Sequence, residues 1–501
     1  MASFSELANL SADVVANIAK VERSQGDCRH ATGIRCIAVK GEMASFHPHT
    51  LPSTLREPSY SDPLVSDASS LLAEIRRAQR VSIRLSGRIL LGSLPLDEFG
   101  NLIDIVSRGQ SVTLWSSEDE GASLDGEGMG RVLEVWSGGQ VLLQNVWLTG
   151  GRTIDGGGCA WVQNVATWLV IRGGGFFNCS TSGQDGGGMV VAGGTVITDG
   201  TVFEDCTVRR ANGGNARGGG LSIQVGEIFL NGTSFVETRT YNSAGGAYGG
   251  GIALWGAGPV VLRNVSFVRT SVTTEHPSAH VFGGGFAAFS GTSELQNVSF
   301  INTSVVSLGK GRAYGGAVGM NAGHASLYDC SIEGSTVHGG RAAYGGGVGS
   351  PFGGTMALNG VRLSHTSVSA PAVASGSALY SLPNQLVAAH LSLRQSCGEG
   401  EAGGPRAGDE NATSLIGTEG AGGLLLRSLT VDAPGCQTLD NHTSLLQCAD
   451  VEHACGAAAI CTDSDDAAHP TPICACAAND PHLPFVEWVP SDEAQSTQLA
   501  P

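Results

Sequence analysis

The sequence is poor in charge and in aromatic side chains. Charged residues make up 15% of the 501 residues and aromatic residues 6%, and both fractions are low for a globular enzyme. Acidic residues outnumber basic ones and give a formal net charge of −17, which argues against nucleic acid and anionic membrane surfaces as partners. No stretch reaches eighteen consecutive apolar residues, so we expect no transmembrane segment in this chain.

A secretory signal is also missing, because no basic segment followed by an apolar one opens the chain. Features described below nevertheless favour an extracellular or cell-surface protein. A truncated N-terminus is the simplest reconciliation, and an intracellular protein is the alternative. Residues 1–60 show only one short apolar periodicity, so we interpret them as a poorly defined N-terminal region.

Glycine, by contrast, is abundant, with 74 residues that recur in clusters of two or three. The distances between the starts of successive clusters are 30, 32, 31, 34, 32, 30 and 30 residues, and such a period is typical of a repeat architecture. The clusters begin at Gly156, Gly186, Gly218, Gly249, Gly283, Gly315, Gly345 and, in eroded form, Ser375.

Between the clusters, apolar residues keep their positions while their neighbours vary. Residues two apart, such as Val265 and Phe267, are apolar and mark strands with one buried face. The repeat is rich in Val, Phe, Thr and Ser and is interrupted by Gly, which favours strands and turns over helices. Helical solenoids need long runs with few glycines, so the glycine content argues against them.

These patterns predict an all-β protein whose residues 61–395 form a right-handed, single-stranded parallel β-helix of about ten coils. Equivalent residues of successive coils then lie about 4.8 Å apart, and glycine provides the positive φ and close approach needed at corners. A helix over 67–79 is expected to cap the open first coil. Two sets of stacked side chains are predicted, an apolar column and an aromatic ladder: Val265, Val298, Cys330 and Val361, and Tyr248, Phe282, Tyr314 and Tyr344.

The repeat resembles two known groups of proteins over about 80–395. Paired glycines followed by an apolar strand, as in Gly250-Gly251-Ile252, and the segment Phe300-Ile301-Asn302-Thr303 resemble the repeats of polymorphic outer membrane proteins. Those proteins are surface adhesins of the autotransporter type. The equivalent segment elsewhere carries Arg269 at the Asn position, which departs from the pattern. The region also resembles right-handed β-helix proteins of the pectin-lyase-like class, and both resemblances imply a fold more than a function.

The C-terminal part is rich in cysteine, which indicates disulfides in an oxidising compartment. Six of the thirteen cysteines lie within 41 residues, at Cys436, Cys448, Cys455, Cys461, Cys474 and Cys476. The spacing from Cys448 to Cys476 resembles the first five cysteines of an EGF-like module, which we place at 436–480. The sixth cysteine of such a module is either missing or replaced by Cys436. Zinc is the alternative, with His453 and His469 as available histidines. We interpret 396–435 as a linker and 481–501 as a disordered tail.

Candidate modification sites also favour a secreted glycoprotein. Glycosylation sequons lie at Asn9, Asn178, Asn231, Asn264, Asn297, Asn302, Asn411 and Asn441. Because Asn264 and Asn297 share a column with Asn145, a stacked and unglycosylated ladder of amides is the alternative. Cys179 and Cys206 occupy the same place in consecutive repeats, so we predict that they are neighbours able to form a disulfide.

No catalytic residue, cofactor or metal site is predicted. Ten acids occur between Asp185 and Ala374, and only Glu204 and Asp205 are adjacent, whereas a glycosidase needs two carboxylates within about 10 Å. We interpret this pair as a solvated strand end. His276 and His280 could hold a metal, but an exposed loop is the simpler interpretation. Six tryptophans could form a sugar-stacking platform or serve as packing: Trp115, Trp136, Trp147, Trp161, Trp168 and Trp255.

Two classes of function remain. The favoured one is a non-catalytic cell-surface or secreted protein, which uses the side of the stack for adhesion by binding a glycan or a protein. The other is a carbohydrate-active enzyme, either a polysaccharide lyase or a glycoside hydrolase. Columns of acids facing a basic residue would indicate the enzyme, and the repeats show none. Fold alone does not decide, because such scaffolds host both.

Overall fold

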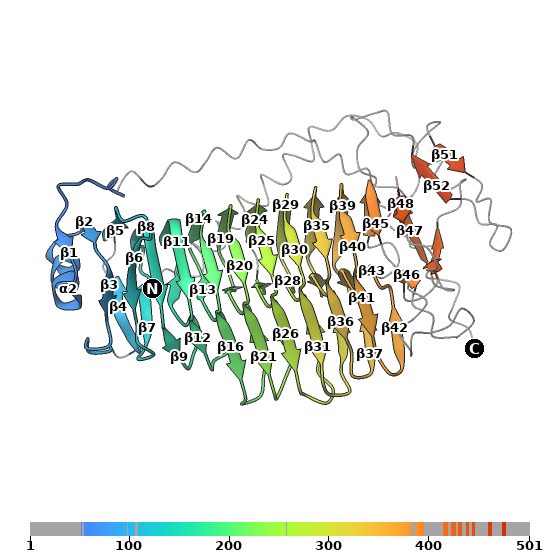
Figure 1. Ribbon diagram of the computed structural model, residues 1–501, viewed down its shortest axis with the longest axis horizontal. Coiled ribbons are helices and arrows are strands. Elements are labelled where there is room, and N and C mark those ends of the chain that lie inside the picture. The colour runs from blue at the N-terminus through green and yellow to red at the C-terminus, as the bar shows by residue number, and fades with distance from the viewer. Residues whose placement is uncertain are drawn as a thin grey trace, which may run out of the picture.

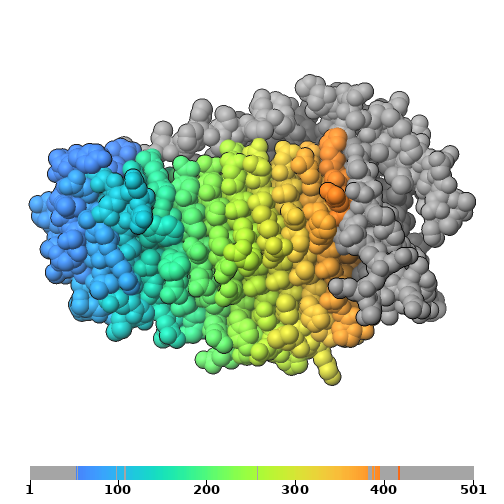
Figure 2. Space-filling view, viewed as in Figure 1, coloured from blue at the N-terminus to red at the C-terminus, as the bar shows by residue number. Residues whose placement is uncertain are grey.

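The computed structural model describes residues 52, 55–97, 99–105, 109–256, 258–381 and 386–394, together with short strands between 414 and 476. The chain winds into a parallel β-solenoid of about ten turns with almost no helix. Figure 1 shows the strands of successive turns side by side along one axis, and Figure 2 shows that the turns follow one another in sequence order along the molecule. The all-β solenoid predicted from the glycine period is confirmed.

Each complete turn passes through five parallel ladders of strands, which we number in chain order. Ladder 1 contains β1 (Leu64–Val65), β2 (Arg80–Leu85), β5 (Ser111–Ser116), β8 (Gln140–Thr149), β11 (Trp168–Phe177), β14 (Thr195–Asp199), β19 (Glu227–Asn231), β24 (Pro259–Arg263), β29 (Thr292–Gln296), β34 (His324–Tyr328), β39 (Thr355–Asn359), β44 (Leu386–Ala389), β47 (Gly422–Leu426) and β50 (Thr443–Leu445). Ladder 2 contains β3 (Arg88–Leu90), β6 (Ala122–Asp125), the second halves of β8 and β11, β15 (Val202–Glu204), β20 (Ser234–Val236), β25 (Ser266–Val268), β30 (Ser299–Ile301), β35 (Ser331–Glu333), β40 (Arg362–Ser364), β45 (Leu391–Arg394) and β48 (Leu429–Asp432).

The remaining ladders are shorter or narrower. Ladder 3 contains β9 (Arg152–Thr153), β12 (Ser180–Thr181), β16 (Thr207–Arg210), β21 (Arg239–Asn242), β26 (Ser271–Thr274), β31 (Ser304–Ser307), β36 (Thr336–His338) and β41 (Ser367–Ser369). Ladder 4 contains β17 (Ala216–Arg217), β22 (Ala247–Tyr248), β27 (Val281–Phe282), β32 (Arg312–Tyr314), β37 (Ala342–Tyr344) and β42 (Val373–Ser375). Ladder 5 contains β4 (Asn101–Ile105), β7 (Arg131–Val135), β10 (Ala160–Gln163), β13 (Met189–Ala192), β18 (Leu221–Ile223), β23 (Ile252–Leu254), β28 (Phe286–Ala288), β33 (Val318–Met320), β38 (Val348–Ser350), β43 (Leu379–Ser381), β46 (Ser414–Thr418) and β49 (Gln437–Leu439).

Single residues with left-handed backbone form the bends that separate ladders 1, 2 and 3. Asn264 and Asn297 occupy the first bend with φ of 53° and 52°, and Arg269 and Asn302 occupy the second bend, both with φ of 53°. Asn and Asp tolerate this conformation better than most residues. The predicted amide ladder is present in part: Asn297 Nδ2 donates to Asn264 Oδ1 at 2.7 Å and Asn264 Nδ2 donates to Asn231 Oδ1 at 3.0 Å. The Asn145 amide is not part of it and donates to Glu118 O.

The glycine clusters lie at the corner between ladders 4 and 5. Gly249 has φ of 62°, and a Cβ atom there would lie 2.0 Å from the carbonyl oxygen of Ile252. Both the backbone conformation and the lack of space therefore require glycine, as predicted from the repeat.

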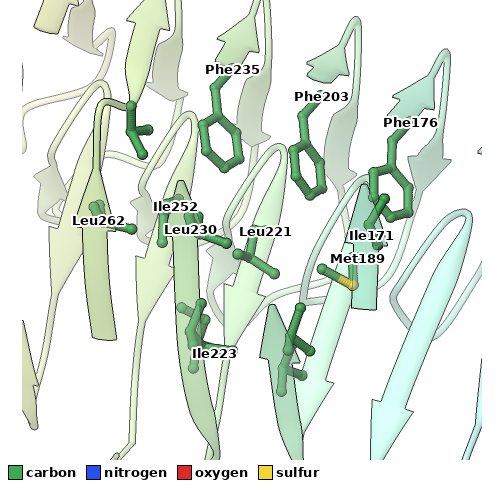
Figure 3. Packing of buried hydrophobic residues seen from close by; sticks show 14 of the residues in the cluster. Ile171, Phe176, Met189, Phe203, Leu221, Ile223, Leu230, Phe235, Ile252 and Leu262 are labelled. Carbon is green, nitrogen blue, oxygen red and sulfur yellow. The ribbon is translucent and has the colours of Figure 1, made fainter. Parts of the chain in front are cut away.

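The main core fills the space enclosed by ladders 1, 2 and 5. Phenylalanines from successive turns stack along it, as Figure 3 shows for Phe176, Phe203 and Phe235. The ring centroids of these neighbours lie 4.4 and 4.7 Å apart. The predicted apolar column is confirmed: each member is buried in this core, and Ser299 N donates to Val265 O on the preceding turn.

A second apolar layer lies where ladder 4 covers the outer face of ladder 5. The predicted aromatic ladder is confirmed here, since Phe282 stacks on Tyr314 at 4.9 Å and Tyr314 on Tyr344 at 5.2 Å. These rings pack over small residues of ladder 5, among which are Ala253 and Ala287. The ladder therefore leaves only part of the outer face of ladder 5 open to solvent.

One helix, α2 (Ala68–Arg77), occurs among the described residues, and it caps the first coil as predicted. The side chain of Asp67 accepts a hydrogen bond from Ser70 N at 2.9 Å, which satisfies a free donor of the first turn. Leu71 and Ile75 are buried in the main core. The helix thus covers the apolar end of the stack, which would otherwise expose an open edge.

Two sequence interpretations need correction. First, Cys179 forms a disulfide with Cys159, not with Cys206. Thr207 N donates to Cys179 O, so Cys206 does lie on the adjacent turn; however, Cys159, 5.4 Å away between Cα atoms, is the partner. Second, the segment 396–435 contains β46, β47 and β48, which pair in parallel with β43, β44 and β45 and so extend the ladders instead of forming a linker.

Candidate functional site

From β7 to β33, the outer face of ladder 5 carries one partly exposed side chain per turn, at the end of the strand or directly after it. The residue directly before each of these side chains, such as Val162, Ile223 or Leu254, points into the core. Because side chains alternate along a strand, the following residue points outward. Backbone bonds keep the series in register, because Trp255 N donates to Ile223 O and Phe289 N donates to Leu254 O. We call this series the axial column: Trp136, Gln163, Ala192, Gln224, Trp255, Phe289 and Asn321.

In the first half of the axial column, polar groups are held by neighbouring carboxylates. Trp136 Nε1 donates to Asp104 Oδ1 at 2.8 Å. Gln163 Nε2 donates to Glu134 Oε1. Gln224 Nε2 donates to Asp185 Oδ2 at 3.1 Å. Three column members therefore have fixed orientations before any ligand arrives.

The Glu134 carboxylate belongs to a buried network centred on Arg131. The Arg131 side chain is 2% exposed and reaches Glu134 Oε2 at 3.2 Å and Asp155 Oδ1 at 2.9 Å. It also donates to Asn101 Oδ1 and to the carbonyl oxygens of Gly156 and Gly157. Every direction of the guanidinium is thus used within the protein, as a buried charge requires.

Burial changes the acidity of two of these carboxyls. It raises the pKa of Glu134 above its ordinary value, although Arg131 and Asn101 act in the opposite direction. Burial also raises the pKa of Asp104, where the hydrogen bond from Trp136 opposes it and the charge of Asp97 adds to it. Both shifts follow from desolvation of the charged form.

Asp185 connects the polar half of the column to its aromatic half. It is 5% exposed and accepts from Ser222 Oγ at 3.0 Å, while Arg217 NH1 lies 3.4 Å from its Oδ1. The same guanidinium lies over the ring of Trp255, with its central carbon 3.7 Å from the ring centroid. A cation over an indole face is attracted by the ring quadrupole, so Arg217 fixes Trp255 and covers one face of its ring.

The second half of the axial column is aromatic. Trp255 and Phe289 have ring centroids 4.6 Å apart, and Tyr248 of ladder 4 packs edge-on against Phe289 at 4.4 Å. Further along the same face, Phe352 is 45% exposed and packs against His280. Burial and nearby Arg312 lower the pKa of His280.

The structure brings only two of the six candidate tryptophans, Trp136 and Trp255, into this column. Trp161 lies beside it under the guanidinium of Arg131, at 4.6 Å. Trp115 is buried and donates to Asp62. The other two, Trp147 and Trp168, lie in ladders 2 and 1. The six tryptophans therefore do not form one platform.

The other predicted site residues lie apart from the axial column. Glu204 is the last residue of β15, and Asp205 occupies the following bend, 3.8 Å from Arg239; this agrees with the strand-end interpretation. His276 Nδ1 accepts from Ser278 N. Within the described part of the chain, no group of three or more His, Cys, Asp and Glu side chains is arranged to hold a metal ion.

Asn178 and Asn302 are exposed at the second bend, whereas the side chains of Asn231, Asn264 and Asn297 form the amide ladder. Asn411 and Asn441 lie outside the described residues, as do Cys436, Cys448 and Cys455. Of the other tail cysteines only the backbone is described: Cys461 and Cys474 are opposite each other in the antiparallel pair β51 (Ala459–Thr462) and β52 (Ile473–Cys476).

The sequence patterns do not identify most of the axial column or the acids beside it. Asp104 and Glu134, which are paired on adjacent turns, lie before the range 185–374 in which the acids are compared. A usable signal does exist, because the fourth residue after a glycine cluster is a column member in five successive repeats: Ala192, Gln224, Trp255, Phe289 and Asn321.

A separate open cleft of about 600 Å³ lies beside the first turns, on the outer side of ladders 2 and 3. Asp125 and Glu127 both line it, together with Arg88, Arg152 and Phe177. Arg88 donates to Asp125 Oδ2, and Glu127 Oε2 accepts from Gly92 N. The cleft thus brings two carboxylates together, but each already has an internal partner.

No protein-family model, curated protein or solved structure matches the chain. In the part of the chain that the structure describes, no helix is both long and apolar enough to cross a membrane.

Proposed function

We propose that the protein is a non-catalytic, extracellular or cell-surface protein that binds a glycan along the axial column. The carrying observation is the column itself, in which Gln163, Gln224, Trp255 and Phe289 are partly exposed and held by neighbouring side chains. Exposed aromatic edges offer apolar contact to sugar rings, and amides bond hydroxyl groups. Because the strands repeat about every 4.8 Å, an extended polymer meets one column member per turn, and many weak contacts add.

The extracellular location rests on the disulfide between Cys159 and Cys179, since disulfides form and persist in oxidising compartments. The resemblance of the repeats to polymorphic outer membrane proteins supports a surface adhesin, and the resemblance to pectin-lyase-like proteins supports a carbohydrate ligand. The cysteine-rich tail, with its EGF-like spacing, serves in this proposal as a second interaction module.

A carbohydrate-active enzyme is the second candidate, and the cleft is the observation that favours it. Two carboxylates near one bond are the requirement for glycoside hydrolysis, and Asp125 and Glu127 line the same cavity. If this candidate holds, purified protein releases reducing ends or unsaturated products from a polysaccharide panel. Asp125→Asn and Glu127→Gln then abolish the release, whereas Trp255→Ala does not.

Affinity electrophoresis in gels that contain soluble polysaccharides tests the binding proposal. We expect at least one polysaccharide to slow the wild-type protein without being degraded, and Trp255→Ala to lose this retardation. Trp147→Ala is the matched control, since Trp147 is also partly exposed but lies in ladder 2; it should behave like wild type. Equal retardation of both variants and wild type would place the ligand elsewhere and contradict the proposal.

A further inference from the structure

The axial column has a chemical polarity that bears on the class of glycan it accepts. An ionised carboxylate only accepts hydrogen bonds, so Glu134 and Asp185 require the NH₂ group of Gln163 and Gln224 to face them. This is the observed arrangement, since Nε2 of each amide donates to its carboxylate. The carbonyl oxygen, at the other end of each planar amide, is therefore directed away from the carboxylate.

The same constraint removes another donor. The single N–H of Trp136 is used by Asp104, and an indole has no second polar atom. One N–H of each amide remains beside its carbonyl oxygen, so Gln163 and Gln224 each offer an acceptor and a donor. A hydroxyl-rich ligand, whose groups both donate and accept, matches this half of the column. Sugar hydroxyls can donate, whereas carboxylate and sulfate groups cannot.

The net charge of the layer around the column favours the same class of ligand. Asp97, Asp104, Glu134, Asp155 and Asp185 lie in this layer, linked to the column or to one another by hydrogen bonds, ion pairs or electrostatic coupling. Three arginines counter them: Arg131, Arg210 and Arg217. Arg131 makes all its contacts internally, and Arg217 lies flat on Trp255. Five negative and three positive groups leave the layer negative, as is the whole chain at −17.

We infer that the axial column selects neutral, hydroxyl-rich polysaccharides and rejects polyuronates and sulfated glycans. This inference rests on the proposed function and names the ligand class of the same site. The exposed edges of Trp255 and Phe289 give apolar contacts to the sugar, while Gln163 and Gln224 accept hydrogen bonds from hydroxyls. The carboxylate or sulfate oxygens of an acidic polymer cannot donate hydrogen bonds to these amide oxygens. Their negative charge would also lie close to the acids of a partly desolvated layer, where repulsion is screened less than at an open surface.

The test compares neutral and acidic polysaccharides in affinity electrophoresis at low and at raised ionic strength. The neutral probes are a soluble β-glucan, xyloglucan and galactomannan; the acidic probes are polygalacturonate, alginate and heparin. We expect a neutral probe to retard the protein, with an apparent Kd about tenfold or more lower than for any acidic probe at equal chain length. Trp255→Ala should lose this retardation, and Gln224→Lys, which adds a positive donor, should gain binding to polygalacturonate.

Two contrary results are distinguishable. Stronger retardation by an acidic probe, lost in Trp255→Ala, would overturn the inference about ligand class and leave the proposed function intact. Absence of retardation by every probe would overturn the proposed function and the inference with it. Far-ultraviolet circular dichroism and the Tm of each variant show whether it has folded, and Gln224→Met supplies a second, uncharged replacement of similar size.

Discussion

At the scale of single residues, the left-handed positions set the path of every turn. Bends between ladders need one residue with positive φ, and the chain fills them with Asn, Asp, Gly and occasionally Arg or Glu. The bends tolerate side chains because these point to solvent. Positions such as Gly249 in the glycine clusters tolerate no side chain, because a neighbouring carbonyl occupies the space of a Cβ atom.

This difference gives a paired prediction. Gly249→Ala and Gly200→Ala both place alanine at positive φ, at 62° and 63°, which costs about 1–2 kcal/mol. Only at Gly249 does the new Cβ meet a backbone atom, at 2.0 Å, whereas nothing lies within 4 Å at Gly200. We expect Gly249→Ala to lose a further 1–3 kcal/mol or so of unfolding free energy, measured by chemical denaturation. Equal losses would show that space is not the constraint.

Asp104 gives a prediction about pH. Burial and the charge of Asp97 raise its folded-state pKa above the ordinary 3.8, against the hydrogen bond from Trp136. Between 3.8 and the raised value, the folded protein holds a proton that the unfolded chain has lost, so this contribution to stability falls as pH rises. Asp104→Asn should flatten that part of the pH dependence of denaturation midpoints. Asp119→Asn, on an exposed turn, is the control and should leave it unchanged.

At the scale of elements, the stacked phenylalanines hold ladder 2 against the core. Phe235 is fully buried between Phe203 and Phe267, at 4.7 and 5.0 Å between ring centroids. Phe235→Ala should cost about 3–5 kcal/mol of unfolding free energy. Val225→Ala, at a side chain that is 55% exposed, should change it by less than about 0.5 kcal/mol. A loss below about 1 kcal/mol for Phe235→Ala would contradict the packing described for this core.

The disulfide gives a second prediction at this scale. Cys159 and Cys179 are 20 residues apart, and closing a loop of this size stabilises by about 3 kcal/mol in the chain-entropy model. Reduction should therefore lower the Tm of the wild type but not that of the Cys159→Ser/Cys179→Ser double variant. Peptide mapping that finds Cys179 joined to Cys206 would contradict the pairing.

How much of this follows from the sequence differs between fold and site. The period, the columns and the aromatic ladder are local patterns repeated many times, and each predicted stack is present. The disulfide was assigned to the wrong partner because the column of Cys179 and Cys206 was visible in the repeats, whereas the approach of Cys159 across the coil was not. The pairing of Asp104 and Glu134 could not be predicted from the sequence, because the first turns lack the glycine clusters by which later repeats can be aligned.

At the scale of the whole molecule, the solenoid provides a long and rigid surface, and α2 caps its N-terminal end (Figure 1). Ladder 4 covers part of the outer face of ladder 5 and leaves the axial column as the open strip beside it. Because the strands are fixed by pairing with both neighbours, little ordering is needed when a polymer binds. The stack therefore suits many weak contacts better than one deep site.

The most direct measurement is a crystal structure of the protein with an oligosaccharide from the neutral polysaccharide that retards it most. The structure described here predicts sugar rings over Trp255 and Phe289, hydroxyls on Gln224, and a chain that runs parallel to the solenoid axis. An oligosaccharide bound instead in the cleft at Asp125 and Glu127, with the axial column empty, would contradict the central claim.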